Sequence, residues 1–174
     1  TLRKLGGLYQ QQGQIDIAKE LFEESLAIEE RLGNAQGTAE AMGWLAGLKA
    51  NQGDVEGAIA LYNQSLEITE KIGDVQGKAA TLHCLAGLKA NQGDVEGAIV
   101  LFQQSLEIKE KIGNVQGKAI TLWWLGGIAN SQGNSAVAID YLQESFTILQ
   151  RIGSPDTLAV QELLNRITGE PQQR

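Results

Sequence analysis

The chain has 174 residues, of which 43% are apolar; this fits one compact domain or a short repeat array, with no run near the ~20 residues that cross a bilayer. Its net charge of −7 argues against nucleic acid and against an anionic membrane surface as the main partner, because both attract clustered lysine and arginine. The single cysteine, Cys84, excludes an internal disulfide and favours a cytoplasmic, reducing setting.

Nine α-helices are predicted, because apolar residues recur at spacings of three and four between short polar breaks. In one such break, Gly93 suits the left-handed backbone just past a helix end, and Asp94 suits the N-cap of the next helix. Before the last helix, Ser154 is the expected N-cap and Pro155 stands in the first turn. In chain order the predicted helices span residues 1–12, 14–32, 35–51, 54–72, 75–91, 94–112, 115–131, 134–152 and 155–168.

The chain repeats itself at an offset of 40 residues, and residues 45–59 recur without a change as residues 85–99. Arrays of this kind bury a core by stacking neighbouring units, and they usually present an extended binding surface. Because Thr1 falls inside a unit, we expect the chain to be a fragment of a longer protein. The expected units are 1–32, 33–72, 73–112 and 113–152, followed by a capping helix at 153–168 and a tail or linker at 169–174.

The repeated motif pairs a leucine followed by a small residue with an alanine that precedes a large residue by four positions. The first unit has Leu5-Gly6 with Tyr9, then Ala18 with Phe22. This pattern resembles the tetratricopeptide repeat. Its longer period is similar to that of kinesin light chain, of the G-protein signalling modulators and of bacterial regulators that contain such arrays. The resemblance implies an all-α, right-handed α-solenoid of antiparallel helix pairs, with about four repeats and a capping helix. HEAT, armadillo and WD40 repeats share the period but fit the turn and the helix lengths less well.

The sequence also departs from the family pattern at three positions, and at one of them the family tyrosine is replaced by Lys49, Lys89 and Ala129 in the later units. The family tryptophan is replaced by Leu2, Met42, Leu82 and Leu122. The proline that ends the second helix is absent, so that helix runs on, in agreement with a period of 40 instead of 34.

In this family the first helix of each pair lines a concave wall, and the resemblance implies which residues lie there. Glu40, Ala80 and Ile120 would stand one helical turn before the wall residues of their units. The partner-binding residues expected on the wall are Arg3, Lys4, Gly7, Gly43, Trp44, Gly47, Lys78, His83, Cys84, Gly87, Lys118, Trp123, Trp124 and Gly127.

Two kinds of residue on this wall admit both a structural and a functional interpretation. Glycine costs ~1 kcal/mol against alanine inside a helix, and it recurs at positions 7, 47, 87 and 127. These glycines indicate either close approach of neighbouring first helices or a smooth floor for a partner. Trp44 and Trp124 stand at equivalent positions, with Cys84 between them, and are either anchors for a partner or packing residues between helices. Trp123 carries the same pair of interpretations.

Charge is distributed unevenly between the two helices of each unit. Acidic residues concentrate on the second helices, whereas the first helices carry Arg3, Lys4, Lys78 and Lys118. One interpretation is a partner that is apolar with some acidic residues; the other is ordinary solvation of exposed helices. The family's clamp for a terminal carboxylate is not expected, because glycine stands where that clamp needs asparagine.

No catalytic, metal or cofactor site is predicted. The only histidine, His83, is adjacent to Cys84, and neighbouring residues on a helix point about 100° apart, so the two do not form a nucleophile–base pair. We therefore predict a non-catalytic protein–protein interaction scaffold that binds a peptide or protein segment along the groove. The alternatives are a sensor module that binds a small effector and signals to another domain, and self-association through exposed repeat ends.

Overall fold

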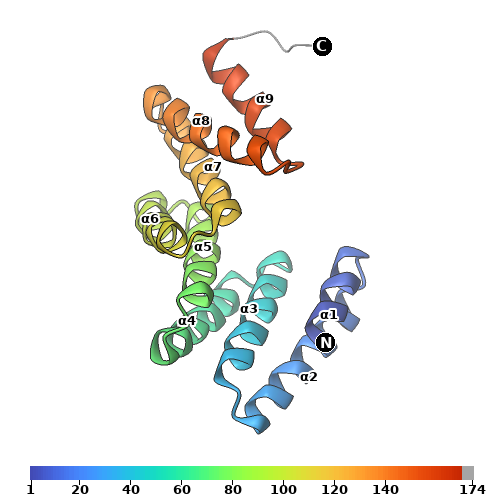
Figure 1. Cartoon of the computed structure of the whole chain (residues 1–174). Helices are drawn as coiled ribbons and strands as arrows, with labels where there is room; N and C mark the ends of the chain where they lie inside the picture. The colour runs from blue at the N-terminus through green and yellow to red at the C-terminus, as the bar shows by residue number, and fades with distance from the viewer. Residues whose placement is uncertain (170–174) are drawn as a thin grey trace. The chain divides into compact units, whose positions relative to one another are not determined.

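The computed structural model describes residues 1–169, and this part of the chain contains nine α-helices and no strand (Figure 1). The predicted all-α class is therefore confirmed. The predicted tail falls on Gly169, which follows the last helix, and on residues 170–174, which lie outside the described residues. The helices are α1 (Leu2–Gln11), α2 (Ile15–Leu32), α3 (Ala35–Asn51), α4 (Val55–Ile72), α5 (Val75–Asn91), α6 (Val95–Lys111), α7 (Val115–Ser131), α8 (Ser135–Arg151) and α9 (Thr157–Thr168).

The breaks between helices have the predicted chemistry. Gly93 has a φ of 86°, in the left-handed region that glycine adopts without steric cost. The Asp94 carboxylate accepts a hydrogen bond of 3.0 Å from the backbone N–H of Gly97, as an N-cap does. Asparagine caps α3, α7 and α8 in the same way, and aspartate caps α4 and α5.

The start of the last helix differs from the prediction. Helix α9 begins at Thr157 with Asp156 as its N-cap, so Ser154 is not the cap and Pro155 lies in the turn before the helix. The reason is local: the Ser154 hydroxyl accepts from the N–H of Asp156 at 3.3 Å, which closes a turn before the helix starts.

The chain divides into two compact units, one of residues 1–93 and one that starts at residue 94. In the first unit each helix from α1 to α5 packs against the next, and the alternate helices α1, α3 and α5 also contact one another in order. In the second unit α6 packs against α7, α7 against α8 and α8 against α9. Each unit is therefore built from consecutive helices that reverse at tight turns. The continuity of a single solenoid over residues 1–168 stays a prediction.

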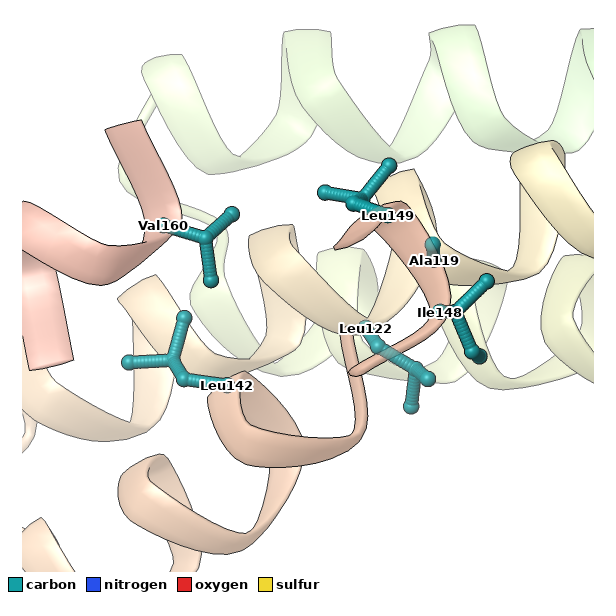
Figure 2. Packing of buried hydrophobic residues seen from close by; sticks show 6 residues of the cluster. All are labelled: Ala119, Leu122, Leu142, Ile148, Leu149 and Val160. Atoms are coloured by element: carbon teal, nitrogen blue, oxygen red, sulfur yellow. The ribbon is translucent and has the colours of Figure 1, made fainter. Parts of the chain in front are cut away.

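Each unit has its own apolar core. In the first, Phe22 and Ala18 of α2 pack with Leu45 and Leu48 of α3, and all four are buried. In the second, six residues of α7, α8 and α9 converge, as Figure 2 shows for Ala119, Leu122, Leu142, Ile148, Leu149 and Val160. Val160 is fully buried, so α9 covers the end of this core as a capping helix does.

A buried hydrogen bond recurs in both units. The Ser65 hydroxyl of α4 donates to the carbonyl of Ala39 in α3 at 2.9 Å, and the Ser145 hydroxyl of α8 donates to the carbonyl of Ala119 in α7 at 2.8 Å. These serines occupy equivalent repeat positions, so the same side chain joins the two helices of a pair in each unit.

No described helix has both the length and the apolar character that crossing a membrane requires.

Candidate functional site

The first helices of the repeats leave a regular row of side chains open to solvent. At one repeat position Lys4, Trp44, Cys84 and Trp124 are all exposed, while the residues that follow directly, such as Leu45 and Leu125, are mostly buried. The preceding position, with Arg3, Gly43, His83 and Trp123, is half-buried throughout. The residues expected on the wall are thus accessible within their own units.

Trp44 and Trp124 have the same environment in the two units. The Trp44 ring stacks on Phe22 of α2 with centroids 5.6 Å apart, and the Trp124 ring stacks on Phe102 of α6 at 5.6 Å. Yet Trp44 is 45% exposed and Trp124 is 40% exposed. Each ring therefore packs between helices and still offers apolar surface to solvent.

A pocket of about 410 Å³ lies beside Trp44 in the first unit. Its walls come from α3 and α5, and its floor includes Tyr62 of α4, which is buried. Burial, and then the neighbouring Cys84 thiol, raise the pKa of Tyr62 above its usual range, so the floor is uncharged. The lining residues are Gln10, Ala39, Glu40, Gly43, Trp44, Gly47, Tyr62, Ser65, Thr69, Asp74, Gly77, Ala80, Thr81 and Cys84.

The second unit has a comparable pocket of about 380 Å³. It is lined by Trp123, Trp124, Gly127, Ile128 and Ser131, all on α7. Trp123 also packs against the core of this unit, so it is partly a structural residue. Both tryptophans of the second unit thus border a pocket whose lining, within residues 1–169, contains no charged residue.

The wall glycines are not required by close approach of helices. A Cβ on Gly87 or on Gly127 would meet no described atom within 4 Å, and one on Gly7 would make ordinary contact with Trp44 at 3.6 Å. Only Gly47 is tighter, with the Tyr62 hydroxyl at 3.3 Å. These contacts favour the interpretation of an open floor.

The glycines that do permit close packing stand one position earlier. A Cβ on Gly6 would lie 2.6 Å from the Phe22 ring, and one on Gly126 would lie 2.6 Å from Leu142 Cγ. The sequence motif contained both residues, but no signal in it showed that a helix of the same unit lies so close.

The basic residues of the wall are mostly ion-paired. Arg3 donates to Glu29 at 2.9 Å and to Glu40 at 2.7 Å, which ties α1 to α2 and α3. Lys78 lies 2.8 Å from Glu70. Lys4 is exposed, and the described residues include no ion-pair partner for it.

Lys118, like Arg3, pairs with two carboxylates. Its Nζ lies 2.8 Å from Glu110 and 2.7 Å from Glu144. The hydrogen bond to Glu110, and then the one to Glu144, raise the pKa of Lys118. Beside it is a hollow of about 400 Å³ that also borders Lys109, which is buried and donates to the Thr121 hydroxyl at 2.9 Å. Sequence reasoning missed Lys109, because lysine at an amphipathic position is normally expected in solvent.

His83 and Cys84 are adjacent in the sequence and differ in exposure. His83 is half-buried and Cys84 is exposed on α5. Within residues 1–169, no group of three or more His, Cys, Asp or Glu side chains is arranged to hold a metal ion. Each unit therefore has a mainly apolar hollow beside an exposed indole.

Comparisons with known proteins agree with this architecture. The sequence profile described as tetratricopeptide repeat matches residues 1–71, 37–111 and 77–151. Among curated proteins no match is found.

Among solved structures, the fold is similar to that of BtubC (BKLC) from P. vanneervenii, with a TM-score of 0.81 and 19% identity over 97% of this chain and 72% of that chain. It is also similar to a Podosopora anserina protein described as a kinesin light chain with nearly identical TPR-like repeats (TM-score 0.75, 25% identity, 99% of this chain and 86% of that one). A Rap protein complexed with Competence and Sporulation Factor has a TM-score of 0.82 and 16% identity, and the match covers 95% of this chain but 47% of that chain.

Proposed function

Because the chain belongs to the tetratricopeptide repeat family, whose domains are generally protein-binding modules, we propose that it is a non-catalytic scaffold that binds a peptide or protein segment along the wall of its first helices. The observation that carries this proposal is the pair of indoles, Trp44 and Trp124. Each is held by a phenylalanine and each borders a pocket of its own unit. Tryptophan is enriched among the residues that dominate binding energy at interfaces.

The pockets are already formed, which lowers the cost of binding. Ring stacking fixes the orientation of each indole, so little side-chain entropy is lost when a partner arrives. The open glycine floor beside Trp124 allows a partner to approach the backbone of α7 at Gly127. We assign the partner-binding role to the full set of wall residues predicted from the sequence, with these two indoles as anchors.

The proposed partner is apolar with some acidic residues. Lys4 is the best-placed cation for an acidic side chain, because it is exposed and stands at the repeat position of Trp44. At Lys78 and Lys118 a partner carboxylate would compete with glutamates of the chain itself, so we expect a smaller contribution there. A cytoplasmic setting remains part of this proposal.

The second candidate is a sensor module for a small effector. It is favoured by the volume of the pocket beside Trp44, about 410 Å³, which is within the usual range for small-molecule sites. Self-association through exposed apolar residues at the end of the first unit, such as Leu5 and Leu8, is a further outcome that sizing experiments would detect.

Selection of binding peptides followed by affinity measurement tests the first proposal. Random peptides selected on residues 1–174 are measured by fluorescence anisotropy against the wild-type chain, the Trp44→Ala/Trp124→Ala variant and a Val100→Ala control. Val100 is an exposed apolar residue of α6, a second helix, so its truncation shows the effect of losing exposed apolar surface outside the first helices. Circular dichroism first establishes equal helicity.

We expect the double variant to lose at least tenfold in affinity, or about 1.4 kcal/mol, and the control to lose less than twofold. Equal affinity for all three chains would mean that the peptides bind outside the wall, and it would refute the proposal that the wall is the binding site. Failure to select any peptide, together with thermal stabilisation by a small metabolite, would favour the sensor module instead.

A further inference from the structure

We propose that the pocket between α3 and α5 takes a basic side chain of the partner, and arginine in particular. The inference rests on the proposed function, since it adds one basic residue to the apolar and partly acidic segment that the wall binds. It is carried by the lining of the pocket, by the exposed surface of Trp44 and by the charges at the rim.

The inside of the pocket fits an aliphatic stem. Small residues line it, including Gly43, Gly47 and Ala80. Its polar floor groups are already partnered, for the Ser65 hydroxyl donates to the carbonyl of Ala39 at 2.9 Å and lies 3.3 Å from the Thr81 hydroxyl. Among the described residues no buried side-chain nitrogen or oxygen lacks a hydrogen-bond partner. Most of the surface that lines the pocket is apolar, so methylene groups suit its interior.

Trp44 provides a surface for a planar cation. Its ring is stacked on Phe22 at 5.6 Å, which fixes its plane, and 45% of the residue remains exposed. A guanidinium packs well against an indole face because the ring quadrupole attracts the cation and the two planar groups can stack.

The charged residues at the rim are both acidic. Glu40 and Asp74 line the pocket, and the part of the chain that the structure describes adds no lysine, arginine or histidine to its lining. Glu40 shares the single guanidinium of Arg3 with Glu29, so two carboxylates face one cation. Asp74 caps α5 by accepting from the N–H of Gly77, whereas the nearest ion pair, that of Lys78, is with Glu70. The local excess of charge is negative, and a cationic side chain complements it.

The chain contains an internal comparison for this chemistry. The pocket beside Trp124 has a similar size and a similarly stacked indole, but none of the described residues that line it is charged. The repeat positions of Glu40 and Asp74 hold Ala80 and Asn114 elsewhere in the chain. The acidic rim is therefore a property of the first pocket and not of the repeat, and the second pocket is expected to take an uncharged apolar side chain.

Two pentapeptides that differ in one charge test the inference on the full chain. Both are acetylated and amidated with the sequence Ala-Leu-X-Leu-Ala, where X is arginine in one and citrulline, its uncharged isostere, in the other. Binding is followed by NMR through the indole N–H of Trp44 and the amides of Gly43 and Gly47, with the indole of Trp124 as the internal reference. The comparison is repeated on a Glu40→Ala/Asp74→Asn variant, whose new residues are those that other repeats already use.

We expect the arginine peptide to bind at Trp44 at least fivefold more tightly than the citrulline peptide, and this preference to fall with added salt. In the variant the preference disappears while citrulline binding and the melting temperature are retained. Equal affinities at Trp44, an equal preference for arginine at Trp124, or no saturable shift at Trp44 with either peptide would overturn the inference. None of these outcomes bears on the peptides selected for the wall, so the proposed function stands or falls on its own experiment.

Discussion

Two adjacent glycines of α7, Gly126 and Gly127, are predicted to respond in opposite ways to the same substitution. Both occupy the interior of a helix, so alanine at either position removes the same conformational cost. They differ in what the new methyl group meets. At Gly127 it meets no described atom within 4 Å, whereas at Gly126 it lies 2.6 Å from Leu142 Cγ and 3.3 Å from the carbonyl oxygen of Ala138.

The magnitudes follow from these contacts. Gly127→Ala is expected to stabilise the chain by about 1 kcal/mol, the difference in helix propensity. Gly126→Ala has the same gain but overpacks a fully buried leucine, at a cost of about 1–3 kcal/mol. Leu142 has no room to rotate away, because its side chain is 0% exposed in the core of the second unit. The difference between the two variants isolates the overpacking, since the propensity term cancels.

Urea unfolding followed by circular dichroism measures both variants against the wild-type chain. We expect Gly127→Ala to raise the transition midpoint and Gly126→Ala to give a midpoint lower than that of Gly127→Ala by the equivalent of 1–3 kcal/mol, with unchanged slopes. Equal midpoints for the two variants would refute the reasoning, because they would mean that the close contact at Gly126 relaxes without cost. If Gly127→Ala also lowers the affinity of peptides that bind at Trp124, the glycine gives a partner access to the backbone of α7 at the expense of stability.

Three further predictions follow from single contacts. Ser145→Ala should lower the free energy of unfolding by about 1 kcal/mol because a buried hydrogen bond is lost, while Thr147→Ala, whose bond is exposed, should change it by less than about 0.5 kcal/mol in the same urea titration. The pKa of Lys118 is raised, first by the hydrogen bond to Glu110, so the protonated lysine stabilises the fold fully below its ordinary pKa of 10.5, and this stabilisation is lost as pH rises through the pKa of the folded state. Above pH 10.5 the melting temperature should therefore decrease more steeply with pH for the wild type than for Lys118→Met. Burial raises the pKa of Tyr62, so tyrosinate absorbance should show one of the three tyrosines ionising only as the chain unfolds, a late step that Tyr62→Phe removes.

The helices could be predicted from the sequence because the relevant signals are local. A run of apolar residues at helical spacing ends at a glycine, and an aspartate or asparagine follows, as at Gly93 and Asp94. These signals act within a few residues, so they do not depend on the tertiary structure. The start of α9 is the exception, because Ser154 and Asp156 both suit a cap and the choice depends on the turn that the Ser154 hydroxyl closes.

The site was less accessible to sequence reasoning, because its features depend on contacts between helices. The positions of Trp44 and Trp124 predicted exposure, but their stacking on Phe22 and Phe102 joins residues 22 positions apart in sequence. Likewise the ion pairs of Lys118 join it to glutamates of α6 and α8, and only the fold shows that its charge is already compensated.

The division between what is repeated and what varies explains why the partner is harder to predict than the fold. Residues 45–59 and 85–99 are identical and contain the turn and its cap, which every unit needs in the same geometry in order to stack on the next. Directly before these identical stretches stand Trp44 in one unit and Cys84 in the other, both exposed. A side chain that faces solvent is under no such requirement, so it is free to differ from unit to unit. If the proposed function holds, specificity is expected at the positions where the repeat breaks its own pattern, and Glu40, Trp44 and Trp124 are the residues that a search for the partner should vary first.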